Sequence, residues 1–151
     1  MRDALDRLIV DLARLDGAAE VGALDPETAR KLSYAEFGTS RGVPPRPTLS
    51  VTTDRLRPAI DRSIRRQVAE VLDGKGRGVT GQEIVGDVGR NLAEEVRDAI
   101  GGDTQPALAP STKASRRRRG KDERTLVDSG DMMRGIAVRT SSDPGAFKDE
   151  D

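Results

Sequence analysis

The chain has 151 residues, with no cysteine, no histidine, and 26 basic side chains against 26 acidic ones. These counts exclude disulfides and thiolate sites, remove the commonest general base and metal ligand, and give no global attraction to nucleic acid or to an anionic membrane. Only 2% of the residues are aromatic, so we expect one domain with a thin core that burial between subunits supplements.

The amino-terminal part of the chain predicts a helix, a strand and a second helix. Residues 2–15 carry an apolar stripe at helical spacing, and this helix packs either on its own domain or on a neighbouring subunit. Residues 20–24 are compatible with a short strand around Val21. Pro26 suits the first position of a helix, which we expect to extend for one or two turns, to Leu32.

The most distinctive stretch runs from residue 33 to residue 49. Residues 34–37 predict a strand, because Tyr and Phe fit a pleated surface, and Phe37 is expected in the core. Gly38 predicts a positive φ, after which Thr39 and Ser40 hydrogen-bond locally and fix the turn. Three prolines in four residues then predict a stiff, extended arm: Pro44, Pro45 and Pro47.

Two charged side chains belong to this stretch. Glu36 is expected to pair with Arg46 or with another arginine near the arm. Such a pair anchors the arm within the subunit; alternatively, Glu36 contacts another subunit. The strand, the glycine turn and the arm together suit the presentation of a backbone edge rather than a catalytic pocket.

A long helix with one basic face is predicted next. It follows an extended segment, residues 49–53, and Thr53 or Asp54 caps it, with Pro58 in its first turn. Its apolar stripe includes Leu56, Ile60, Ile64 and Val68. Its basic face includes Arg55, Arg57, Arg62, Arg65 and Arg66. The glycine-rich residues 73–78 end it.

A second long helix and several short elements complete the chain. Thr80 and Glu83 form a capping box at the start of this helix, and two glycines at residues 101–102 end it. Residues 103–115 are expected to be extended, with a short turn that starts at Thr112. Residues 128–131 resemble the cap of a short helical turn, a strand follows at residues 136–140, and residues 141–151 form a polar tail.

A run of basic residues lies between these elements: Arg116, Arg117, Arg118, Arg119 and Lys121. It is a solvated loop, a loop that faces DNA, or a contact for an acidic neighbouring protein. Phosphate binding by such a loop would be independent of sequence and sensitive to salt. No aromatic residue interleaves with the arginines, so base stacking is not expected.

These elements predict an α+β (α/β) fold. A small mixed sheet, built from Val21 and residues 34–37, 49–52 and 136–140, packs against two long helices and the amino-terminal helix. Residues 1–140 form one domain and residues 141–151 a tail. No catalytic pair stands out, and GKGRGVTG lacks the spacing of a phosphate-binding loop, so we expect no enzymatic activity and no cofactor or metal. No apolar run approaches the ~18 residues of a membrane span, so no membrane association is expected.

Two patches resemble bacteriophage head–tail joining and tail-completion proteins, also called tail-terminator or neck proteins. The first is EFGT at residues 36–39 followed by PPRP at residues 44–47. The second is PALAPST, a basic loop and LVDSGDMMRGIAV, within residues 106–138. The chain departs from the pattern where Thr48 replaces a frequent Phe and Gly135 a frequent Ser, and in having the second patch follow the first.

The resemblance implies a structural virion protein at the head–tail junction. Such a protein forms a homo-oligomeric ring, with six subunits as the favoured number, that terminates the tail tube and joins it to the neck or head. The implied partners are the tail tube protein, a head-completion or adaptor protein and, through non-specific contact, packaged DNA. The implied location is the virion, after assembly in the host cytoplasm.

The resemblance also assigns roles to the two distinctive segments. Contacts with other subunits fall to Glu36, Phe37, Gly38, Thr39, Pro44, Pro45, Arg46 and Pro47. Contacts with DNA or a partner fall to Arg116–Arg119 and Lys121. The alternative function is a DNA-binding accessory module outside the virion that uses the basic helix and Arg116–Arg119. A third is an assembly chaperone absent from mature particles.

Overall fold

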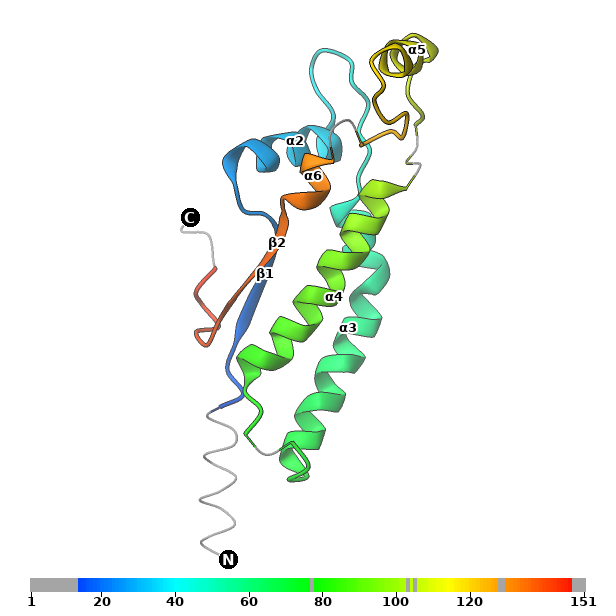
Figure 1. Cartoon of the computed structure of the whole chain (residues 1–151). Helices are drawn as coiled ribbons and strands as arrows, with labels where there is room; N and C mark the ends of the chain where they lie inside the picture. Colours follow the sequence, from blue (N-terminus) through cyan, green and yellow to red (C-terminus); the bar gives the residue numbers. More distant parts are fainter. Residues whose placement is uncertain (1–13, 77, 103, 105, 128–129, 148–151) are drawn as a thin grey trace, which may run out of the picture. The chain divides into compact units, whose positions relative to one another are not determined.

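A computed structural model describes residues 14–147 apart from residues 77, 103, 105, 128 and 129. Within this part of the chain there are five helices and a two-stranded antiparallel sheet, which confirms the α+β class. The elements, in chain order, are β1 (Ala18–Ala23), α2 (Pro26–Phe37), α3 (Leu49–Leu72), α4 (Gly81–Gly101), α5 (Pro110–Arg118), α6 (Asp131–Arg134) and β2 (Ile136–Ser141) (Figure 1). The predicted amino-terminal helix lies almost entirely outside the described residues.

The backbone divides into two compact units of interleaved segments. The first contains Met1–Glu20, Leu56–Asn91 and Val138–Asp151, and the second contains Val21–Arg55 and Leu92–Ala137. The division falls within α3, α4 and both strands.

Most of the buried apolar side chains belong to the second unit: Leu32, Ala35, Ala93, Val96, Ile100, Val127, Met132 and Ile136. In that unit α2 packs against α6, and Gly135 lies so close to Thr28 that an added Cβ would come within 2.5 Å of it. In the first unit Val71 and Ile84 are buried, whereas Leu56, Ile60, Ile64 and Val68 of the α3 stripe are only half-buried.

Helix α2 replaces the strand predicted at residues 34–37. Asp25 accepts a hydrogen bond from the Thr28 amide (2.8 Å), Pro26 occupies the first turn, and Lys31 pairs with Glu27 at 2.7 Å. These contacts stabilise the start of the helix, which continues to Phe37. Tyr34 and Phe37 are accommodated in it because the β preference of Tyr and Phe depends on their surroundings.

Two other segments predicted to be extended are helical. Residues 49–52 form the first turn of α3, so Pro58 lies inside the helix rather than in its first turn, and the sheet has two strands rather than four. Residues 110–115 belong to α5, which starts at Pro110 and continues through good helix formers.

Several other predicted boundaries are confirmed, whereas residues 128 and 129 of the predicted cap at residues 128–131 lie outside the described part of the chain. Thr80 and Glu83 form the capping box: the Thr80 amide donates to Glu83 Oε2 (2.8 Å), and the Glu83 amide to Thr80 Oγ1 (3.2 Å). Helix α6 ends at Gly135 and β2 follows at once, while β1 includes Val21. The two strands are linked by Arg139, whose Nε donates to Glu20 Oε2 at 3.0 Å.

Candidate functional site

The loop that joins α2 to α3, residues 38–48, begins at a glycine that no other residue could replace without strain. Gly38 has φ 72° and donates its amide to Tyr34 O at 3.0 Å. A Cβ on Gly38 would come within 2.6 Å of Val43 O. The positive φ predicted for Gly38 is therefore confirmed, and both conformation and space demand glycine there.

A tight turn follows Gly38. The Thr39 amide donates to Val43 O (3.0 Å), and the Val43 amide donates to the Thr39 hydroxyl (3.4 Å). Thr39 thus closes the turn from both sides, as its position predicted. At the tip, Ser40, Arg41 and Gly42 are exposed.

Glu36 does not pair with Arg46; it caps the amino terminus of α3. Its Oε1 accepts hydrogen bonds from the amides of Thr48 (2.9 Å) and Leu49, and its Oε2 accepts one from the Ser50 hydroxyl (2.9 Å). Thr48 precedes the helix, but its buried Oγ1 makes no hydrogen bond within the described residues. A carboxylate from the last turn of α2 therefore satisfies the first amides of α3, where a negative charge also complements the helix dipole.

Arg46 turns inward from the arm. Only 8% of the residue is exposed, and its amide donates to Ala35 O at 2.6 Å. Its guanidinium donates to two carbonyl oxygens, from Nε to Pro106 (2.7 Å) and from Nη2 to Ala107 (3.5 Å). Arg46 thus holds the arm against the chain that precedes α5, while Pro44, Pro45 and Pro47 remain exposed.

The most exposed large apolar side chain is Phe37, at 82%. Its prediction as a core residue is wrong, because the helix turns it away from the buried face formed by Thr28, Leu32 and Ala35. Tyr34, Val43 and Val51, on the same or adjoining segments, are also about half exposed, between 46% and 56%.

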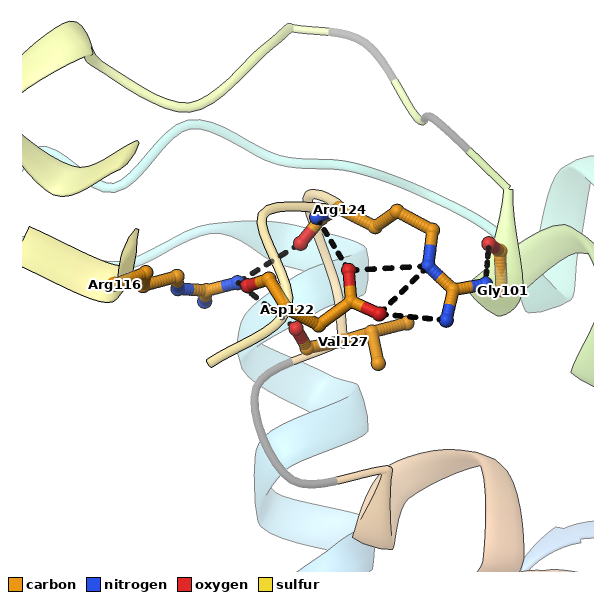
Figure 2. Close-up of polar contacts among 5 residues, drawn as sticks. All are labelled: Gly101, Arg116, Asp122, Arg124 and Val127. Atoms are coloured by element: carbon orange, nitrogen blue, oxygen red, sulfur yellow. Dashed lines mark hydrogen bonds and ion pairs between the residues drawn. The ribbon is translucent and has the colours of Figure 1, made fainter. Parts of the chain in front are cut away.

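The arginine run is largely structured rather than a free loop. Arg116 lies on α5, and its Nη1 donates to three carbonyl oxygens, those of Asp122 (3.3 Å), Arg124 (2.8 Å) and Val127 (3.0 Å). Figure 2 shows this guanidinium directed at the segment that follows α5. One cation thereby organises the backbone of residues 122–127.

Two acidic residues after the run form ion pairs, one with Arg117 of the run and one with Arg124 beyond it. Arg117 forms a two-pronged ion pair with Glu123, at 2.7 and 2.8 Å, and this pairing lowers the pKa of Glu123. The Arg124 guanidinium donates to Asp122 Oδ1 (3.1 Å) and Oδ2 (2.7 Å), and to Gly101 O at 2.8 Å (Figure 2). Hydrogen bonds from the Arg124 side chain, then from its amide, lower the pKa of Asp122 to about 2.

The rest of the run differs from residue to residue. Arg118 is exposed and makes no hydrogen bond or ion pair within the described part of the chain. Arg119 donates from Nε to Ser115 O at 3.3 Å. Lys121 is half-buried and already has an interaction partner. Charge available to an outside partner is thus concentrated at Arg118 and Arg119, a distinction that sequence alone does not reveal.

A cleft of about 360 Å³ opens in the second unit, where α2, the arm and the segments on either side of α5 converge. Its apolar lining includes Tyr34, Val43, Leu108, Leu126 and Met132. Its charged lining consists of Lys31, Arg46, Arg116 and Asp131. The sequence did not predict this cleft, because its residues come from five separate segments.

Among the residues that the structure describes, no acidic cluster has the composition of a metal site, and no helix is long and apolar enough to cross a membrane. The arrangement instead offers a rigid loop, an exposed aromatic side chain and a charged cleft. Comparison with protein-family models, curated proteins and solved structures found no match to this chain.

Proposed function

We propose that the chain is a structural protein of a bacteriophage virion, located at the head–tail junction. It forms a closed ring of identical subunits, with six as the favoured number, that ends the tail tube and joins it to the neck or head. Its partners are the tail tube protein and a head-completion or adaptor protein. It assembles in the host cytoplasm and remains in the virion.

One observation supports this proposal beyond the sequence resemblance. The EFGT and PPRP segment is anchored at two points, where Glu36 of α2 caps the start of α3 and where Arg46 binds the Pro106 and Ala107 carbonyls, while Phe37 is left exposed. A buried anchor behind an exposed aromatic side chain is typical of a surface made for protein contact, where aromatic residues contribute most of the binding energy.

The test is to complement a phage from which the gene has been deleted. Phe37→Asp should leave the melting temperature nearly unchanged, because the side chain is 82% exposed, yet it should yield filled heads and free tails in electron micrographs. Ser33→Asp, which adds the same charge at another exposed position of α2, is the matched control and should restore joining. Normal virions from Phe37→Asp phage would refute the proposal.

The alternative is a DNA-binding module outside the virion. It draws support from Arg62 and Arg66 on α3, one helical turn apart, both exposed and without an ion pair among the described residues, and from Arg118 on α5. Tight duplex binding at moderate salt by the isolated protein would favour this alternative. Mass spectrometry of purified virions separates a virion component from an assembly chaperone.

A further inference from the structure

The cleft of the second unit contains a buried cation that has no acidic partner among the residues that the structure describes. Arg46 is 8% exposed, and its guanidinium bonds only to the carbonyl oxygens of Pro106 and Ala107 within the described residues. A guanidinium has five N–H donors, and these bonds occupy two of them. Because a buried charge is costly unless an opposite charge accompanies it, the remaining donors in the cleft are suited to an anion from outside.

Of the other three charged side chains of the cleft, Arg116 is held by three carbonyl oxygens, and the remaining two are in ion pairs. Lys31 is paired with Glu27 at 2.7 Å, and Asp131 is paired with Arg134. Arg46 therefore contributes the charge that an incoming group would neutralise. Its planar fork of donors matches the two oxygens of a carboxylate.

The lining of the cleft favours a protein carboxylate over nucleic acid. Five apolar side chains surround the charged groups, and the volume of about 360 Å³ suits a side chain or two rather than a polyanionic strand. Asp131 would also repel a string of phosphates more strongly than a single acid. Tyr34 and Val43 on the rim are half exposed and would be covered by the protein that supplies the acid.

The chain itself contains a segment of this chemistry. Asp149, Glu150 and Asp151 are its only run of three consecutive acids, and they follow Phe147 closely. We propose that the cleft around Arg46 binds this acidic segment from a second copy of the chain. A second copy supplies both the carboxylate for Arg46 and enough surface to cover the half-exposed rim.

The proposal goes beyond the proposed function, because the purified protein suffices for this contact, without phage, tail tube or DNA. If virions were found to lack the protein, the cleft could still bind the segment. If the segment failed to bind, the chain could still be a virion protein that uses the Phe37 surface.

The experiment measures binding of a fluorescent peptide of residues 145–151 by anisotropy. The protein carries Asp149→Asn, Glu150→Gln and Asp151→Asn, so that its own segment does not compete. We expect saturable binding of the acidic peptide, and little binding of a peptide with the same three substitutions. Adding Arg46→Gln should weaken binding about tenfold or more, as when one partner of a buried charge pair is removed. Arg62→Gln removes the same charge from an exposed position of α3 and should have no effect.

A second variant guards against misfolding of Arg46→Gln. Tyr34→Glu places a negative charge at the half-exposed rim without disturbing the buried groups, and it should also weaken peptide binding. Equal binding of the acidic and neutral peptides, or unchanged binding by a folded Arg46→Gln protein, would overturn the proposal. So would a duplex DNA that binds in place of the peptide and depends on Arg46.

Sedimentation velocity tests the role of the second copy. The unmodified chain should associate as its concentration rises, and the triple variant should associate less at the same concentrations. A chain that remains monomeric, or association that the three substitutions leave unchanged, would refute docking between copies.

Discussion

At the scale of single residues, Gly38 is a position where both the backbone conformation and the available space require glycine. Gly38→Ala imposes a side chain at φ 72° and within 2.6 Å of Val43 O, so we expect a loss of about 1 kcal/mol or more in the free energy of unfolding. Chemical denaturation measures the loss. Gly42→Ala is the matched control for positive φ alone, because a Cβ there meets nothing within 4 Å. Equal losses would show that the close approach to Val43 is unimportant.

Asp122 makes the stability of the segment after α5 depend on pH in the acid range. Because folding lowers its pKa from 3.8 to about 2, its ionised form stabilises the fold fully above pH 4, and this stabilisation is lost as the pH falls toward 2. An NMR titration of the Asp122 carboxyl carbon should give a midpoint well below 3.8. Arg124→Gln removes the first cause of the shift and should return the midpoint toward the ordinary value. A midpoint near 3.8 in the unmodified protein would contradict this contact.

At the scale of elements, Glu36 joins two helices through a cap. Glu36→Ala leaves the amides of Thr48 and Leu49 without their acceptor, and we expect it to cost about 1–2 kcal/mol of stability, with hydrogen exchange increasing in the first turn of α3. Glu95→Ala removes an exposed ion pair with Arg55 and should cost less than about 1 kcal/mol. Equal effects of the two substitutions would mean that the cap is unimportant.

This cap also explains which elements the sequence could predict. The capping box at Thr80 is local, with donor and acceptor three residues apart, so the start of α4 was predicted correctly. The start of α3 was misplaced because its cap comes from Glu36, 13 residues before Leu49, and not from Thr53 or Asp54. A cap supplied from another element leaves no local pattern.

The candidate site was predictable to a similar degree. The turn at Gly38 was expected from the conformational freedom of glycine. The separate anchors of Glu36 and Arg46, and the exposure of Phe37, depend on which face of α2 is buried, and a strand was expected there instead. The ion pairs that follow α5 were missed, although the acids at residues 122–123 directly follow the basic run and were a visible signal.

At the scale of the whole molecule, the arginines of residues 116–119 no longer form one group. Exposed arginines usually contribute little to stability, whereas Arg116 donates to three carbonyl oxygens. We therefore expect Arg116→Gln alone to cost about 2 kcal/mol, because it removes hydrogen bonds from a charged donor. Chemical denaturation of this variant, beside Arg118→Gln as a control of equal charge, measures the difference. Equal stability would show that the Arg116 contacts do not matter.

Function can be tested with the two exposed arginines instead. Arg118→Gln with Arg119→Gln should leave stability nearly unchanged. If these side chains meet packaged DNA, particles with the double variant should assemble normally but retain their genome less well, with the effect growing as the salt concentration falls. Failure of head–tail joining would instead indicate contact with an acidic protein, and no change in either assay would identify a solvated surface.

The turn at residues 39–43 should accept inserted residues without loss of the fold. Its two ends are fixed independently of its tip, by the Gly38 amide on Tyr34 O and the Arg46 amide on Ala35 O. Doubling the length of such a loop costs only about 0.6 kcal/mol of closure entropy. An epitope tag inserted after Arg41 should therefore be displayed without loss of the fold, and lineages of this protein are free to diversify at this tip while the helices beneath it stay the same.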